Sequence, residues 1–214
     1  MTQKQGAPIA QPKRPRNAAL TREAILQSAL VAFSRHGYDG IGVREIAQAA
    51  GVTAVLVNRY FGSKEELFAA TVERSFADRM LIDGDLATLA ERMAAVVVSK
   101  SETGAEPLDP FRLLLRSAPN PRAAEILRDS IARHYERPLK DLLQGPRAGQ
   151  RAGMILALIA GFQLWRKVIG SKALSDANVA SLSGDLKTMF QRLIDSPASG
   201  KAPNRRSRVK KRDQ

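Results

Sequence analysis

The sequence predicts an all-α protein with a three-helix N-terminal domain and a C-terminal helical bundle. Apolar residues recur at intervals of three and four along most of the 214-residue chain, which is the period of an amphipathic helix. No stretch shows the sustained alternation of apolar and polar residues that is typical of a strand. A hydrophobic content of 44% is enough to fill a core, so a folded protein is expected.

The first helix is predicted over residues 22–36. Thr21 is a good N-cap, and the helix ends before Gly37. One apolar stripe runs along it, formed by Ile25, Leu26, Ala29, Leu30 and Phe33.

A second helix over 43–50 and a short third helix over 53–61 follow. Gly51 is placed to take the left-handed conformation that ends the second helix, and Thr53 can cap the third. In the third helix Val57 and Phe61 are four residues apart and share an inward face. The consecutive polar residues 58–60 point about 100° apart, so no single buried partner can satisfy them and they must face outward.

The fourth helix begins at residue 64 and runs to about 80, because Ser63 and Glu66 form an S-x-x-E capping box. Pro138 is expected to kink or end a later helix. The remaining helices are predicted at 86–100, 109–118, 121–143, 149–169 and 177–195.

Positive charge is concentrated at the two ends of the chain. Of the net charge of +13, residues 1–20 contribute +4 and residues 197–214 contribute +6. Both ends are rich in Pro, Gly and polar residues, so disordered basic arms are predicted at 1–20 and 197–214. Such arms either contact a polyanion such as nucleic acid or are simply solvated, and composition leaves both interpretations open.

Several classes of protein are not expected. The absence of cysteine excludes disulfides and thiolate metal sites, and His36 and His134 fit no metal-ligand spacing, so no metal or cofactor is expected. Residues 1–20 lack the apolar core of a secretory signal, and the longest apolar run, 154–162, is shorter than the roughly 20 residues that cross a bilayer. We therefore expect a cytoplasmic protein without a membrane segment. No catalytic constellation is recognisable, which argues against an enzyme.

The second and third helices, joined through Gly51, form a helix-turn-helix arrangement, in which the second helix enters the major groove of DNA. Residues 21–68 resemble the N-terminal DNA-binding region of the tetracycline-repressor-like (TetR) family of bacterial regulators, through GY, VREIA, AGVT and FGSKEEL in this order and spacing. The resemblance implies a homodimer, mostly a repressor, that binds a double-stranded DNA operator. It also implies that residues 69–196 form a domain for dimerisation and for binding an unknown small-molecule effector.

The resemblance further implies which residues contact DNA. Arg44 and Lys64 correspond to contacts with bases or phosphates, whereas Thr53 is equally suited to capping alone. Leu56 stands where threonine is frequent and could touch a thymine methyl group. Gly42 replaces a residue whose hydroxyl caps the second helix, so that contact is lost. The candidate DNA-binding residues are Arg44, Thr53, Ala54, Val55, Leu56, Asn58, Arg59, Tyr60 and Lys64, with Arg14 and Arg16 from the arm.

The arm enters this set because the DNA-binding region is otherwise neutral. Residues 21–70 hold five basic and five acidic side chains. We therefore hypothesise that the KRPR sequence at 13–16 adds phosphate or minor-groove contacts. The tail at 197–214 either adds non-specific DNA affinity or is solvated.

The C-terminal domain offers candidates for a dimer interface and an effector pocket. Small and apolar residues in the last two predicted helices suit a homodimer interface or the core of one subunit, and both roles are open. An aromatic residue at helical spacing is more often core than ligand wall, which limits the pocket prediction. The interface candidates are Gly153, Ala157, Ala160, Gly161, Leu186, Phe190 and Leu193, and the pocket candidates are Phe111, Leu115, Arg116, His134, Phe162 and Trp165.

Two other functions compete with a sequence-specific regulator released from a palindromic operator. A sequence-nonspecific, nucleoid-type DNA-binding protein would also make use of the basic ends. A helical carrier of a lipophilic small molecule would bind ligand but no operator. Binding to one DNA sequence that persists in the presence of competitor DNA would distinguish the sequence-specific regulator from both the nucleoid-type protein and the carrier.

Overall fold

The computed structural model describes residues 14–77, 82, 84–101 and 110–195. Within these residues every regular element is helical, which confirms the predicted all-α class. The chain forms two compact units. The first comprises the residues up to 76 together with 106–128, and the second comprises 77–105 together with the residues from 129 on. No helix in the described ranges has the length and apolar character needed to cross a membrane.

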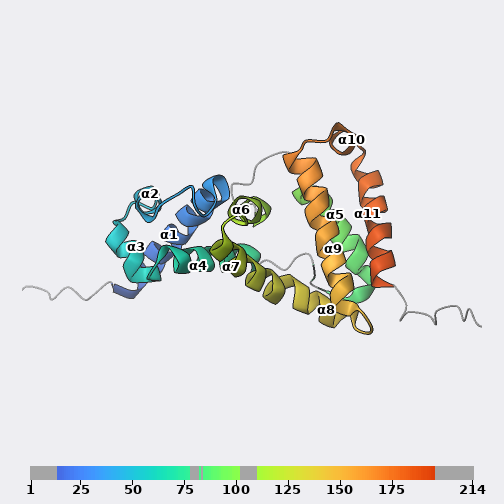
Figure 1. Ribbon diagram of the computed structural model, residues 1–214, viewed down its shortest axis with the longest axis horizontal. Coiled ribbons are helices and arrows are strands. Elements are labelled where there is room, and N and C mark those ends of the chain that lie inside the picture. Colours follow the sequence, from blue (N-terminus) through green and yellow to red (C-terminus); the bar gives the residue numbers. More distant parts are fainter. Residues whose placement is uncertain (1–13, 78–81, 83, 102–109, 196–214) are drawn as a thin grey trace, which may run out of the picture. The chain divides into compact units, whose positions relative to one another are not determined.

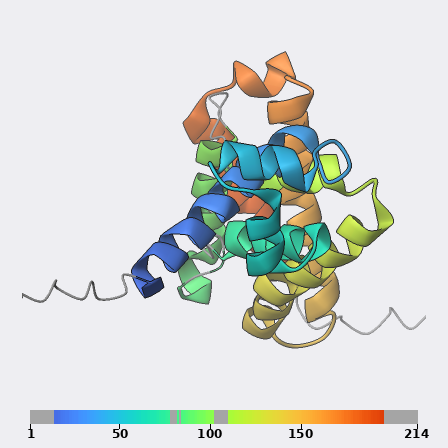
Figure 2. The same cartoon turned by 90° about the vertical axis from the view of Figure 1, so that its left-hand side faces the viewer.

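The first unit contains the helix-turn-helix. The predicted apolar stripes form its core, because Ile25, Phe33, Val57 and Phe68 are at most 1% exposed. Figures 1 and 2 show α2 packed against α1, with α3 following directly after it. The helices of this unit are α1 (Arg14–His36), α2 (Val43–Ala49), α3 (Ala54–Phe61), α4 (Lys64–Phe76), α6 (Pro110–Ser117) and most of α7 (Pro121–Ile131).

The first helix begins earlier than predicted, at Arg14 rather than at residue 22. The last part of the predicted disordered arm is therefore helical, and this part of the prediction was wrong. The alanines and leucine at 18–20 favour a helix strongly, and Pro15 lies in the first turn, where its missing N–H leaves no hydrogen bond unmade. Residues 1–13 of the arm and the tail at 197–214 lie outside the described residues.

Helices α6 and α7 connect the middle of the chain to the N-terminal helices. The Nη1 atom of Arg116 donates to the carbonyl oxygen of Arg35 at 2.7 Å, and Nδ2 of Asn120 donates to Oδ1 of Asp39 at 2.9 Å. Gly37 has a φ of +72°, and a Cβ atom there would clash with the carbonyl of Arg116. Residues 110–128 therefore belong to the first unit, and the predicted domain division after residue 68 does not coincide with the compact units.

In the second unit, α5, α9 and α11 lie side by side (Figure 1). Pro138 does not end its helix, because a wider π-helical turn precedes it, closed by the N–H of Arg137 on the carbonyl of Ala132. The short α10 was not predicted. The elements of this unit are α5 (Leu86–Lys100), η1 (Ala132–Glu136), α8 (Arg137–Leu143), α9 (Ala148–Gln163), η2 (Leu164–Val168), α10 (Lys172–Ser175) and α11 (Val179–Ile194).

Two buried arginines satisfy backbone groups at the helix ends of this unit. Arg151 donates to the terminal carbonyls of α8 at 3.0 Å and of α11 at 2.8 Å. Arg166 donates to the carbonyl of Val98 at 3.1 Å and to Oγ of Ser101 at 2.8 Å, at the end of α5. The last carbonyls of a helix have no partner within it, so these cations replace a cap and favour the negative end of the helix dipole.

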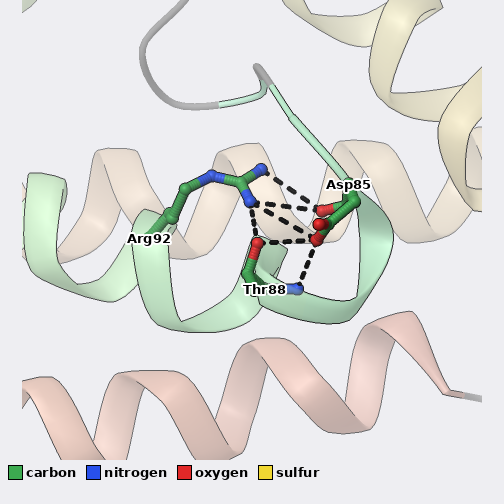
Figure 3. A network of polar contacts seen from close by, with 3 residues as sticks. All are labelled: Asp85, Thr88 and Arg92. Atoms are coloured by element: carbon green, nitrogen blue, oxygen red, sulfur yellow. Dashed lines mark hydrogen bonds and ion pairs between the residues drawn. The ribbon is translucent and has the colours of Figure 1, made fainter.

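The start of α5 is fixed by a network of three side chains (Figure 3). Oδ1 of Asp85 accepts hydrogen bonds from the backbone N–H of Thr88 at 2.9 Å and from its hydroxyl at 2.7 Å. Nη1 of Arg92 lies 3.8 Å from the same oxygen. The hydrogen bonds from Thr88, and secondarily the charge of Arg92, lower the pKa of Asp85 below its usual value.

This network predicts a stability difference that depends on pH. A carboxyl with a lowered folded-state pKa stabilises the protein above its unfolded pKa of about 3.9 and loses that contribution as pH falls through the folded value. We expect Asp85→Ala to lower the Tm at pH 7, with the difference shrinking below about pH 4. Thermal melts monitored by circular dichroism would measure it. Asp185→Ala, at an exposed mid-helix position, is the control, and equal pH profiles for the two variants would contradict the prediction.

Candidate nucleic-acid interface

The turn between α2 and α3 has the geometry that the sequence predicts. Gly51 takes the left-handed conformation, with a φ of +69°. The N–H of Val52 donates to the carbonyl of Ala47 at 2.9 Å, which closes the end of α2. Thr53 then caps α3, since its hydroxyl oxygen accepts a hydrogen bond from the N–H of Leu56 at 3.3 Å. The two helices are thereby held as a helix-turn-helix.

Helix α3 has one buried and one exposed face. Val57 and Phe61 are 1% and 7% exposed and anchor the helix. Val55 is 78% exposed, and Asn58 and Arg59 are exposed on either side of it around the helix, because successive residues turn by 100°. These three residues, which we call the reading face, form the part of α3 that is available to a partner.

The other candidate residues of α3 lie at the edges of the reading face. Ala54, Leu56 and Tyr60 are half-buried. A hollow of about 530 Å³ separates α3 from the first part of α1, and it is lined by Ala18, Leu56, Arg59 and Tyr60. Because Leu56 faces this hollow and Val55 faces outward, the structure favours Val55 over Leu56 for an apolar contact with a base.

The first turns of α1 and α2 include three further candidate residues. Arg14 and Arg16 fall in the first turn of α1 rather than in an unstructured arm. Arg44 is exposed near the start of α2. Gly42 precedes α2 without any side-chain cap, as predicted from its missing hydroxyl.

The start of α4 presents Lys64 at a helix N-terminus. The N–H of Glu66 donates to Oγ of Ser63 at 3.1 Å, which confirms the predicted capping contact. The Nζ atom of Lys64 lies 4.6 Å from the ring centroid of Tyr38, a cation–π contact between two half-buried side chains. Tyr38 is itself held edge-on to Phe68, with ring centroids 5.0 Å apart.

The contact of Tyr38 with the candidate residue Lys64 was missed by sequence reasoning, because the two residues lie 26 positions apart and no local pattern links them. Burial raises the pKa of the Tyr38 phenol, and the negative charges of Glu65 and Asp39 raise it further, while Arg122 acts in the opposite direction. The ring therefore remains a neutral phenol under Lys64 at physiological pH.

The candidate dimer residues divide into two groups. Leu186 and Phe190 are 4% and 0% exposed within one chain, so they belong to the core of the second unit rather than to an exposed interface. Ala157 and Gly161 are exposed on α9, and the remaining candidates, Gly153, Ala160 and Leu193, are half-buried. Because α11 packs the first pair against its neighbours, Leu186 and Phe190 fit the core role that the sequence left open, and the dimer interface stays a prediction.

The candidate pocket residues fall in different units. Phe111, Leu115 and Arg116 belong to the first unit, where Arg116 is engaged with the backbone of Arg35. The second unit holds the other three, of which Trp165 is 54% exposed. The effector pocket stays a prediction. The candidates in the second unit are His134, Phe162 and Trp165.

The second helix of this helix-turn-helix has an exposed face, and a lysine lies at the N-terminus of the next helix. This arrangement is typical of DNA-binding proteins that place the second helix in the major groove. Residues 25–71 match the family model described as bacterial regulatory proteins, tetR family, and residues 87–194 match the tetracyclin repressor-like C-terminal domain. The second match alone covers half of the chain. The chain belongs to the TetR family of bacterial regulators.

Curated relatives are similar to the chain over part of their length. The transcriptional regulatory protein RaaS of Mycobacterium tuberculosis is 43% identical over 88 residues, which are 38% of this chain and 41% of RaaS. The regulator RutR of Escherichia coli K12 is 39% identical over 70 residues, 33% of either chain. The chain thus spans less than half the length of these relatives.

Solved structures share the fold over most of the chain. A TetR-family regulator from Streptomyces coelicolor A3 has a TM-score of 0.53 at 24% identity, covering 86% of this chain and 99% of that one. Reduced NemR of Escherichia coli has a TM-score of 0.63 at 20% identity, covering 83% and 100%. At these identities the likeness shows the fold alone.

Proposed function

We propose that this protein is a sequence-specific transcriptional regulator, a cytoplasmic homodimeric repressor that a small-molecule effector releases from a palindromic operator. The observation that carries the proposal is the reading face of α3, where Val55, Asn58 and Arg59 are exposed together above a buried anchor. Relatives named as transcriptional regulators support it.

The chemistry of the reading face suits the edges of bases in the major groove. An arginine donates two hydrogen bonds to guanine O6 and N7, and an asparagine pairs in the same way with adenine N6 and N7. An exposed valine fits the C5-methyl group of thymine. Arg44, Thr53 and Lys64, with the first turn of α1, supply phosphate contacts that set the position of α3 on the duplex.

A homodimer is supported by one apolar stripe along α9 and η2. Soluble monomers rarely leave such a continuous apolar surface uncovered. A second copy of the chain is the occupant that fits, since a two-fold interface places like surfaces together and sets two reading faces on half-sites one helical turn apart. The exposed residues of this stripe, which we call the α9 stripe, are Met154, Ala157, Gly161, Trp165, Val168 and Ile169.

The decisive experiment is selection of DNA from a random library with the purified protein. We expect enrichment of a palindrome. The protein should bind this palindrome about 10³-fold or more tightly than it binds competitor DNA of unrelated sequence. A nucleoid-type protein would enrich no sequence. Sequencing the region upstream of the gene for the selected palindrome would then indicate which genes are regulated.

The contact of Val55 with thymine can be tested at the level of one methyl group. Replacing thymine by deoxyuracil in the selected operator removes only the C5-methyl. At one thymine position in each half-site, we expect this replacement to weaken binding of the wild type by up to about tenfold. This is the effect expected when one buried methyl group is lost from each half-site. Fluorescence anisotropy with each uracil-substituted duplex measures the loss.

Val55→Ala should bind the thymine and uracil duplexes equally, because its side chain no longer reaches the methyl group. Leu56→Ala is the matched control on the same helix, and it should retain the preference for thymine, since Leu56 faces the hollow beside Ala18. A thymine preference that vanishes in Leu56→Ala and persists in Val55→Ala would contradict the assignment.

A further inference from the structure

An ion pair joins α7 to the start of α4 directly beside Lys64. The Nε atom of Arg122 lies 3.1 Å from Oε1 of Glu65. The same guanidinium contacts Oε2 of Glu125, one turn further along α7, at 3.1 Å. These two carboxylates, Glu65 first, raise the pKa of Arg122 above its ordinary value.

Asn120 holds the segment that carries Arg122, both within α7 and against the turn after α1. The side-chain oxygen of Asn120 accepts hydrogen bonds from the N–H groups of Arg122 and Ala123, both at 3.0 Å, and so caps α7. The amide nitrogen of Asn120 reaches Asp39 in the turn after α1 at 2.9 Å. The start of α7 is therefore fixed relative to the turn after α1, and Arg122 extends from a defined position.

Glu65 presents a conflict for DNA binding. A carboxylate in the first turn stabilises α4 through the helix dipole. The same turn offers backbone N–H groups and the ammonium of Lys64, which favour a phosphate, and the carboxylate of Glu65 would repel that phosphate. Neutralisation of Glu65 by a cation from another helix resolves the conflict without loss of the helix-stabilising charge.

We propose that Arg122 is a positioning residue for DNA binding, which neutralises Glu65 and so leaves Lys64 and the start of α4 available to a backbone phosphate. This inference rests on the proposed DNA-binding function. Tyr38 completes the arrangement, since its neutral ring lies 4.6 Å from the ammonium of Lys64 and so contacts this cation without a competing negative charge.

The test is a double-mutant cycle of Arg122→Gln and Glu65→Gln, with affinities measured by fluorescence anisotropy at low salt. The probes are the duplex selected by the wild type and a random duplex of equal length. Because a phosphate contact is independent of sequence, we expect Arg122→Gln to weaken binding to both probes, by at least about fivefold. In the Glu65→Gln background the same change should have less than about a twofold effect.

Arg128→Gln is the matched control, because Arg128 is exposed on the same helix, and it should change neither affinity. Arg122→Lys should retain most of the binding, since it keeps the charge. Melting temperatures should agree among the wild type and the Arg122 and Arg128 variants, because an exposed ion pair contributes little to stability.

An equal loss in both Glu65 backgrounds would mean that Arg122 contacts DNA itself, and would overturn the positioning role. No loss in the wild-type background would also overturn it. These results are independent of the proposed sequence specificity, because the random duplex reports on phosphate contacts even if no palindrome is selected.

Discussion

Replacing Ala157 by Asp should convert the protein into a monomer and remove its specific binding to DNA. Ala157 is exposed within the α9 stripe, between Met154 and Gly161. A carboxylate buried there against a second copy would have no partner, and an uncompensated buried charge costs several kcal/mol. Without the dimer the two half-sites are read singly, so operator affinity should fall toward the non-specific level, by about 10³-fold or more.

Light scattering during size-exclusion chromatography would measure the oligomeric state, and anisotropy with the selected operator would measure the affinity. Ala173→Asp is the matched control, since Ala173 is exposed on the short α10 and lies outside the α9 stripe. A dimer that persists in Ala157→Asp, with operator affinity unchanged, would show that the α9 stripe is not the interface.

The second large effect is expected for Arg59→Ala. Arg59 is the cation of the reading face, and a bidentate pair with guanine discriminates against the wrong base by about 1–3 kcal/mol. With one such pair in each half-site of a dimer, operator affinity should fall by about thirtyfold or more. Val57 and Phe61 anchor the helix on its other face, so the fold should be retained.

The salt dependence shows what Arg59 contacts. If Arg59 contacts bases, Arg59→Ala should lower the affinity for the operator far more than for random DNA and leave the salt slope unchanged. A phosphate contact would lower both affinities and reduce the slope by about 0.9 per contact. Arg128→Ala, at an exposed position on α7, is the control. Operator affinity equal to that of the wild type would remove Arg59 from the reading face.

Helix periods and caps were predicted well from the sequence because both are local. The inward placement of Val57 and Phe61 follows from a spacing of four, and the caps of Thr53 and Ser63 follow from a side chain that reaches an N–H three residues away. The helical start of α1 was missed although its cause is also local. The basic, proline-containing KRPR stretch is typical of a disordered arm, but the alanines that follow it have a high helix propensity.

Contacts between residues far apart in the chain could not be predicted from the sequence. The cation–π contact of Lys64 with Tyr38 and the ion pair of Arg122 with Glu65 join side chains 26 and 57 positions apart, and no periodic pattern links them. The burial of Arg151 was likewise invisible, because its partners are backbone carbonyls at the ends of two other helices.

The helical class, the helix-turn-helix and the outward direction of Asn58 and Arg59 were predictable from the sequence, since each depends on residues within a few turns of one another. Only the tertiary structure decided that residues 110–128 pack with the N-terminal helices and that Val55, rather than Leu56, is presented outward. The physical reason is that exposure and charge pairing are set by which helices pack together, and packing depends on the whole chain.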